Sequence, residues 1–199
     1  MTKLELLLVV TVLVAFAGLA YAGFDEGMDA YDRGDYAKAY RQFKPLAERG
    51  DIDAQFYLGV MYDFGRGVSQ DCIQAIKWYR KAAERGFPPA QRELGGLYAN
   101  GQGVPQDHAK AVEWYRKAAE QGDDEAQFEL GWAYADGKTV PQDFIQAYMW
   151  FDLAAAHKGD TYAEDYAADF RDSLAEKMTP AQLAKAQRLA KKWKPKGRD

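Results

Sequence analysis

The sequence predicts an all-α fold, a solenoid of helix–turn–helix repeats, from three observations. One stretch recurs three times, and its leading alanines, Ala54, Ala90 and Ala126, are 36 residues apart at each step. A fixed period of about 20 to 50 residues is the sequence signature of a solenoid. Apolar side chains within each copy fall at helical spacing. Glycines and aspartates stand where one helix must end and the next begin.

The first helix of each copy is predicted from a stripe of apolar residues. In the first copy this stripe is formed by Ala54, Leu58, Met61 and Tyr62, which share one face of a helix. Gly65 follows at the position of a helix stop, because glycine readily adopts the left-handed conformation that ends a helix. We therefore expect the first helix to bury this stripe and to end at Gly65.

An aspartate stands at the predicted start of each second helix, where its side chain can accept hydrogen bonds from the free N–H groups of the first turn. These N-cap residues are Asp71, Asp107 and Asp143. The second apolar stripe of the first copy consists of Ala75, Trp78, Tyr79 and Ala82, and Gly86 ends it. Because one helix pair cannot cover both of its faces, the copies are expected to stack on one another.

The repeated pattern reads A-x-x-x-L-G-x-x-Y-x-x-G-x-G-V-x-Q-D-x-x-x-A-x-x-W-Y-x-x-A-A-x-x-G. From Ile52 to about Gly159 it closely resembles the Sel-one-like repeat, a relative of the tetratricopeptide repeat. The third copy departs from the pattern, since Thr139 replaces the second turn glycine and one extra residue precedes Gly159. The resemblance implies a right-handed α-solenoid, an origin in the bacterial cell envelope and a role as a non-catalytic adaptor.

The predicted organisation has a leader, four repeats and a helical cap, with no linker between them. The expected segments are a signal peptide (1–22), a degenerate tetratricopeptide-like repeat (23–51), three full repeats (52–87, 88–123 and 124–160) and C-terminal capping helices with a basic tail (161–199). The cap is predicted from Thr179-Pro180-Ala181-Gln182, a capping box with proline at the first helical position.

The leader predicts export. Its apolar run is shorter than the roughly 20 residues that a membrane-spanning helix needs, and Ala20-Tyr21-Ala22 is typical of a signal-peptidase site. Cleavage between Ala22 and Gly23 would give a periplasmic or secreted protein. The alternative is an uncleaved N-terminal anchor.

The residues offer little material for catalysis. The chain has two histidines, His108 and His157, one cysteine, Cys72, and no nucleophile motif, metal-ligand spacing or phosphate-binding glycine loop. Cys72 is interpreted as a small, partly buried side chain rather than a reactive thiol. The net charge of −4 does not favour nucleic acid. We therefore expect no catalytic residue, metal, cofactor, small-molecule substrate or nucleic-acid partner.

A partner-binding surface is predicted from first-helix positions that the repeat leaves variable. They are Tyr57, Val60, Phe64, Glu93, Asn100, Glu129, Trp132 and Asp136, with Gly96 among them. Trp132 is informative because its counterparts are Val60 and Gly96, so the repeat does not require an aromatic residue there. In stacked helix pairs such positions line the surface that binds extended partners. The other interpretation is an ordinary solvated helix surface.

The C-terminal tail is strongly basic in a chain of negative net charge. The basic residues are Lys185, Arg188, Lys191, Lys192, Lys194, Lys196 and Arg198. One hypothesis is weak association with an anionic membrane or cell-wall polymer, which salt would screen. The other is a charged helix face with a frayed end.

The favoured function is a protein-interaction scaffold of the bacterial cell envelope that binds a protein or peptide. The alternatives are a module that binds cell-wall glycan through exposed aromatic residues, and a subunit of an envelope enzyme that acts on β-lactam or peptidoglycan.

Overall fold

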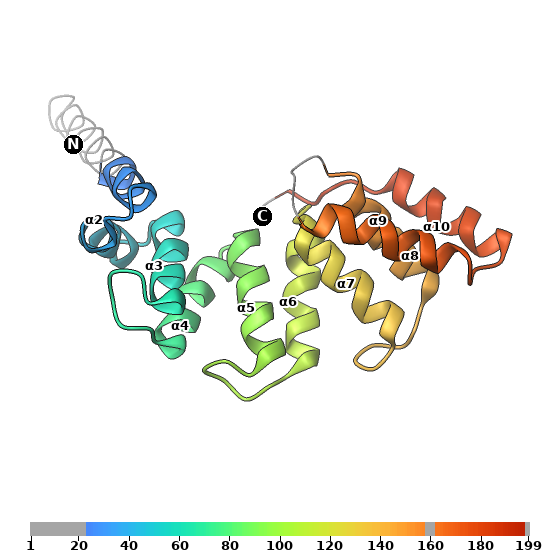
Figure 1. Ribbon diagram of the computed structural model, residues 1–199, viewed down its shortest axis with the longest axis horizontal. Coiled ribbons are helices and arrows are strands. Elements are labelled where there is room, and N and C mark those ends of the chain that lie inside the picture. Colours follow the sequence, from blue (N-terminus) through green and yellow to red (C-terminus); the bar gives the residue numbers. More distant parts are fainter. Residues whose placement is uncertain (1–22, 158–161, 198–199) are drawn as a thin grey trace, which may run out of the picture. The chain divides into compact units, whose positions relative to one another are not determined.

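The computed structural model describes residues 23–157 and 162–197 (Figure 1). Every regular element in these two ranges is a helix, so the predicted all-α class is confirmed. None of the helices within these ranges combines the length and the apolar character that crossing a membrane requires. The predicted leader, its cleavage residue Ala22 and the extra residue before Gly159 lie outside the described residues.

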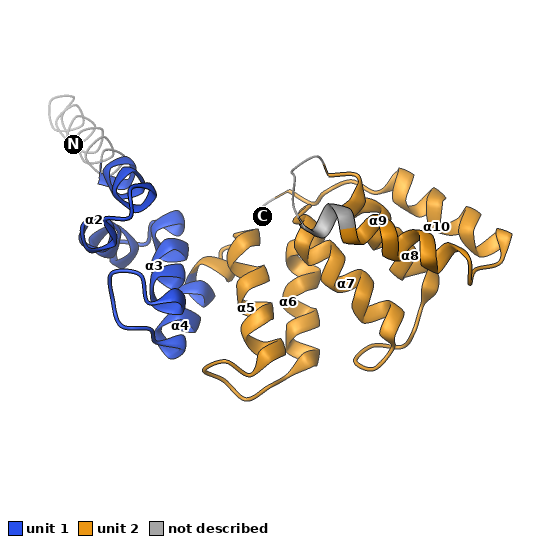
Figure 2. Cartoon of the chain, in the orientation of Figure 1, with its two compact units in different colours: residues 1–81 blue, residues 82–199 orange. Residues whose placement is uncertain are grey.

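The chain forms two compact units, residues 1–81 and residues 82–199 (Figure 2). The boundary falls inside a helix, α4 (Cys72–Ala83). The sequence shows no linker there, because α4 carries the same pattern as the other second helices of the repeat.

The first unit contains a helix whose described residues are 23–32, then α2 (Tyr36–Glu48), α3 (Ile52–Phe64) and most of α4. α2 packs against α3. Their shared core contains fully buried side chains from both helices, among them Ala39, Phe43, Leu58 and Met61. The degenerate first repeat thus supplies an apolar face of the kind that its sequence predicts.

The second unit contains six complete helices in the part that the structure describes. They are α5 (Pro88–Asn100), α6 (His108–Glu120), α7 (Asp124–Asp136), α8 (Phe144–Ala155), α9 (Tyr162–Ala175) and α10 (Pro180–Lys192). α5 packs against α6, α6 against α7, and α7 against α8 (Figure 1). α9 and α10 both pack on α8, as the predicted C-terminal cap requires.

The predicted helix caps are confirmed. The carboxylates of Asp71, Asp107 and Asp143 each accept backbone hydrogen bonds from the first turn of the following helix, at 2.9–3.1 Å. Gly65 adopts φ +65° at the end of α3, in the left-handed region that favours glycine. Thr179 and Gln182 form the predicted capping box at the start of α10.

The turn of the third copy closes like the others although Thr139 replaces a glycine there. The Gln142 side-chain amide donates to the Ala135 carbonyl at 2.9 Å, and the Asp143 backbone N–H donates to the Tyr134 carbonyl at 3.1 Å. The second copy makes the equivalent side-chain bond from Gln106 at 2.8 Å. The departure from the pattern at Thr139 therefore leaves the hydrogen bonds of the turn intact.

A buried glutamine joins each first helix to the segment before it. The side-chain amides of Gln55, Gln91 and Gln127 donate to the carbonyls of Ala47, Ala83 and Ala119, at 3.1, 3.0 and 3.2 Å. All three glutamines are at most 5% exposed. Because a buried amide without a partner is costly, this hydrogen bond fixes the spacing between consecutive helices.

The segment after α10 folds back onto α6. The Lys196 backbone N–H donates to the Glu120 carbonyl at 2.8 Å, and the Lys196 ammonium group lies 2.8 Å from the Glu120 carboxylate. The half-buried Trp193 ring packs against Trp150, with ring centroids 6.2 Å apart. The start of the predicted tail is therefore part of the packed structure.

Candidate partner-binding surface

The predicted surface residues of the first unit lie on α3 and differ in exposure. Tyr57 and Val60 are half-buried, whereas Phe64 is 60% exposed. The Tyr57 ring stacks on Phe43 with centroids 5.3 Å apart and lies 6.0 Å from Phe24. Tyr57 thus contributes to packing, and its substitution would disturb the fold as well as any surface.

Phe64 has a cationic neighbour. The Arg66 guanidinium lies 5.2 Å from the centre of the Phe64 ring, and it also donates to the Tyr31 hydroxyl. Phe64 is therefore an exposed aromatic residue whose face is already in contact with a positive charge.

The two α5 members of the predicted surface have different surroundings. Asn100 is exposed at the end of the helix. Glu93 lies 3.1 Å from Arg92, which also contacts Asp123 and pairs with Glu125. Glu93 therefore belongs to a charged cluster that links α5 to the start of α7.

On α7, the structure brings Glu129, Trp132 and Asp136 together along one hollow. Trp132 is 46% exposed, and its ring meets Phe170 of α9 in a T-shaped contact with centroids 5.1 Å apart. Trp132 forms part of the wall of two hollows, one toward α6 and one toward α9. Such an exposed large aromatic side chain, flanked by concave surface, is typical of an interaction site.

The hollow toward α6, here called the Glu129 hollow, has a volume of about 250 Å³. Apolar side chains of α6, including Ala111, Val112 and Tyr115, line it together with His108. Its α7 side is formed by Glu129, Trp132 and Asp136, and the turn adds Lys138. The hollow thus combines an apolar lining with charged groups.

The hollow toward α9, here called the Phe170 hollow, has a volume of about 340 Å³. Four aromatic residues line it: Trp132, Phe144, Phe151 and Phe170. Ser173 and Lys177 of α9 add polar groups. This lining suits an apolar side chain whose backbone remains in water.

Glu129 is a carboxyl group on this surface whose pKa is raised by its surroundings. Burial raises the pKa of its carboxyl group, and the Glu125 carboxylate, which has the same charge, raises it further. No cation among the described residues offsets this effect, whereas Asp136 is paired with Lys138 at 2.8 Å. Glu129 is thus a partly desolvated carboxylate that faces a cavity without a counter-ion from the described chain.

Sequence reasoning missed several lining residues. Phe170 and Leu174 belong to the core of the cap, and they also line the Phe170 hollow. His108, at the start of α6, lines the Glu129 hollow. The 36-residue pattern carries no signal for these contacts, because α9 lies outside the repeat and the Glu129 hollow forms only where α5, α6 and α7 pack together.

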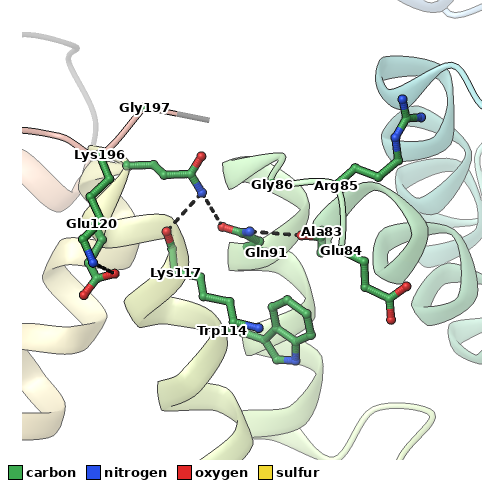
Figure 3. A pocket seen from close by; sticks show the side chains of 11 residues that line it. Ala83, Glu84, Arg85, Gly86, Gln91, Trp114, Lys117, Glu120, Lys196 and Gly197 are labelled. Carbon is green, nitrogen blue, oxygen red and sulfur yellow. Dashed lines mark hydrogen bonds and ion pairs between the residues drawn. The ribbon is translucent and has the colours of Figure 1, made fainter. Parts of the chain in front are cut away.

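A third hollow, of about 500 Å³, lies where the folded-back tail meets α6 (Figure 3). Gln121 donates to the Gln91 side chain at 2.8 Å, and Gln91 donates to the Ala83 carbonyl. The Trp114 ring lies beneath the Lys117 ammonium group, 3.9 Å from it. Several of its polar groups thus bond to one another where the repeats and the tail pack together.

The tryptophans at the repeated second-helix position differ from Trp132. Trp78 and Trp114 are half-buried. The ammonium group of the lysine three residues later, Lys81 or Lys117, lies 4.0 or 3.9 Å from the centre of the ring. Trp150 is 5% exposed and packs in the core. These positions serve packing, as the sequence predicted.

The described basic tail residues are exposed and lie mostly on α10, whereas Arg198 lies outside the described residues. Those with an exposed side chain are Lys185, Arg188, Lys191, Lys192 and Lys194. Their attraction to an anionic surface stays a prediction.

The described part of the chain shows little arrangement for bond chemistry. No group of three or more His, Cys, Asp and Glu side chains in residues 23–157 and 162–197 is placed to hold a metal ion. Cys72 is a half-buried free thiol, consistent with its interpretation as a small packing residue.

Comparison with known proteins gives a consistent result. The Sel1 repeat family matches residues 52–87, 88–123 and 124–158. A Sel1 repeat protein from Oxalobacter formigenes is 40% identical, with a TM-score of 0.58, over 65% of this chain and 96% of that one. No curated protein matches the chain.

A second solved structure is that of c5321, a protective antigen of uropathogenic Escherichia coli strains that displays an SLR fold. It is 30% identical to this chain, with a TM-score of 0.60, over 90% of this chain. The match covers 46% of c5321, so this chain spans less than half the length of that protein.

Proposed function

The chain belongs to the Sel1 repeat family, whose members are generally non-catalytic protein-interaction scaffolds, and we propose that it binds an extended peptide segment of a partner protein across Trp132. The observation that carries the proposal is the position of Trp132. It is an exposed aromatic residue at a site where the repeat needs none, and it separates two hollows of different chemistry.

The mode of binding follows from the linings. An apolar side chain of the partner enters the Phe170 hollow, where it is removed from water against four aromatic rings. The partner backbone crosses the exposed indole of Trp132. Buried aromatic anchors of this kind carry most of the binding energy in interfaces, whereas the surrounding contacts mainly exclude water.

The test uses short random peptides displayed on phage and selected on the full chain. The recovered peptides are then titrated against the full chain and against Trp132→Ala. We expect the substitution to weaken binding by about tenfold or more, the typical loss for an interface hot spot. Circular dichroism melting checks that the variant remains folded.

Tyr166→Ala is the matched control. Tyr166 is a 55% exposed aromatic residue of α9 that lines neither hollow, so its removal should leave affinity unchanged. Peptides that bind the Trp132→Ala variant as tightly as the original chain would contradict the proposal, and so would a selection that recovers no peptide.

We also propose that the protein acts in the bacterial cell envelope after export, as a periplasmic or secreted protein. The support is the sequence of the leader with its Ala22–Gly23 site. Mass spectrometry of the protein from an envelope fraction should give a chain that starts at Gly23. A chain that retains residues 1–22 would favour the anchor instead.

Binding to purified cell-wall sacculi distinguishes the glycan-binding alternative. Strong retention of the full chain on sacculi, abolished by Trp132→Ala, would favour a glycan ligand over a peptide. We expect no such retention, because the aromatic rings that line the hollows form a recess rather than a flat stacking platform.

A further inference from the structure

The Glu129 hollow contains a negative charge that the described chain leaves uncompensated. Two carboxylates, Glu129 and Asp136, line it, and Lys138 pairs with Asp136 at 2.8 Å. The Arg92 guanidinium pairs with Glu125 rather than with Glu129. Glu129 is half-buried, so water screens its charge incompletely.

The tryptophan beside this carboxylate also lacks a cation that two second-helix tryptophans of the chain have. The two half-buried repeat tryptophans, Trp78 and Trp114, each hold a lysine ammonium group over the ring, at 4.0 and 3.9 Å. The position three residues after each is a lysine, whereas the residue three after Trp132 is Ala135. The indole of Trp132 therefore remains exposed without that internal cation.

An exposed indole and an unpaired carboxylate attract the same chemical group. A lysine ammonium or arginine guanidinium group is held by the face of a tryptophan ring within about 6 Å. It also forms strong charge-assisted hydrogen bonds with a carboxylate. The aliphatic stem of either side chain can pack along the apolar lining from Ala111, Val112 and Tyr115.

The size of the hollow fits one side chain. Its volume of about 250 Å³ is below the roughly 300–1,000 Å³ of pockets that enclose a whole small-molecule ligand. A single long side chain that enters from a peptide backbone at Trp132 matches this space and this charge.

We propose that the Glu129 hollow is the subsite for a lysine or arginine side chain of the bound peptide, held between the Glu129 carboxylate and the Trp132 indole. This inference rests on the proposed peptide-binding function and names the chemistry of the partner. The partner segment thus carries a basic side chain beside the apolar one that enters the Phe170 hollow.

The test uses single-residue probes and the NMR signal of the Trp132 indole N–H, assigned from its loss in Trp132→Phe. The cationic probes are N-acetyl-lysine methylamide and N-acetyl-arginine methylamide, and the uncharged probe is N-acetyl-norleucine methylamide. With the full chain, we expect the cationic probes to bind about tenfold more tightly than norleucine, the gain from one desolvated cation–carboxylate contact.

Glu129→Gln should abolish this preference, because the amide keeps the shape of the carboxylate and removes its charge. The matched control is Glu113→Gln, which removes the same charge from an exposed position of α6 that does not line the hollow. It should retain the preference. Equal binding of norleucine and lysine probes, or an unchanged preference in Glu129→Gln, would overturn the assignment.

The phage selection separates this inference from the function on which it rests. Selected peptides that depend on Trp132 but contain no lysine or arginine would overturn the basic subsite and leave peptide binding standing. Selected peptides that do not depend on Trp132 would overturn both. Peptides that need Trp132, contain a basic residue and bind Glu129→Gln more weakly would support both.

Discussion

Gly95 and Gly96 are neighbours on α5, yet a methyl group would meet different surroundings at each. A Cβ atom on Gly95 would lie 2.8 Å from the Tyr115 ring, whereas one on Gly96 would lie 3.7 Å from the Tyr115 hydroxyl. The first contact is a clash with a buried ring and the second is an ordinary van der Waals contact. The close approach of α5 to α6 therefore requires a glycine at position 95 but not at position 96.

We expect opposite effects on stability from the two alanine substitutions. Gly95→Ala should lower the free energy of unfolding by about 1–3 kcal/mol, the usual cost of overpacking. Gly96→Ala should raise it by up to about 1 kcal/mol, because alanine is the better helix former. Urea unfolding of both variants measures this difference. Equal changes in the same direction would contradict the geometry.

Glu129→Gln should stabilise the protein at neutral pH. Burial raises the pKa of Glu129 in the folded state, so its ionised form is less favourable there than in the unfolded chain. Below the pKa of the unfolded chain, Glu129 is protonated in both states and no charge is buried. As the pH rises through the higher pKa of the folded state, the buried carboxyl group ionises and the free energy of unfolding falls. The variant should therefore melt at a higher temperature than the original chain near pH 7.

This advantage should disappear in acid, where Glu129 is protonated in both states. Thermal melting of the two proteins near pH 7 and near pH 4 gives the comparison. A difference in melting temperature that is independent of pH would show that the charge of Glu129 is not the cause. A functional carboxylate that costs stability is a common compromise at binding sites.

At the scale of the element, α10 and the segment after it are held by side chains of unequal importance. Trp193→Ala should lower the free energy of unfolding by about 2 kcal/mol, because the half-buried ring leaves its contact with Trp150. Lys196→Ala should cost less than about 1 kcal/mol, because its ion pair with Glu120 is exposed.

Urea unfolding measures both variants of the tail. A larger loss from Lys196→Ala than from Trp193→Ala would show that the ion pair, not the ring, anchors the segment. The result also guides tests of the basic tail, since truncation after Lys192 would remove Trp193 together with Lys194, Lys196 and Arg198.

Local chemistry explains which elements the sequence could predict. The aspartate caps, the glycine stop at Gly65 and the capping box at Thr179 each act within a few residues, so their pattern is visible in the chain itself. The contact of Phe170 with Trp132 and the return of Lys196 to Glu120 were not predicted. Both join segments that are far apart in sequence and involve residues after the repeat ends.

The candidate site was predicted in part for the same reason. Trp132, Glu129 and Asp136 stood out because they occupy variable positions of a regular helix. Tyr57 occupied an equivalent position, but its ring packs against Phe43. Positions that vary between the copies are thus not needed for packing within the repeat. Such a side chain can still be partly buried by a neighbouring aromatic cluster, as Tyr57 is.

At the scale of the whole molecule, the two compact units should respond separately to a local defect. Gly59→Ala would place a Cβ atom 2.4 Å from the Tyr79 ring, inside the first unit. In a repeat array each repeat contacts only its neighbours, so the defect should remain local. Hydrogen exchange should rise in residues 23–81 far more than in residues 82–199.

Gly95→Ala serves as the reciprocal control, with its clash inside the second unit. Its effect should appear mainly in residues 82–199. Equal increases in exchange along the whole described chain, from either variant, would show that the molecule opens as one cooperative body.

The glutamine hydrogen bond to the carbonyl eight residues earlier has a consequence for how such a chain can change in length. The hydrogen bond from the Gln91 side chain to the Ala83 carbonyl is chemically the same as the one from Gln127 to Ala119. A duplicated 36-residue repeat would therefore carry its own glutamine and its own acceptor carbonyl, and could form this hydrogen bond with the repeat on either side. Tandem duplication of a repeat therefore needs no new kind of contact between repeats. A one-residue deletion between the alanine and the glutamine would instead break this hydrogen bond and shift the helices that follow.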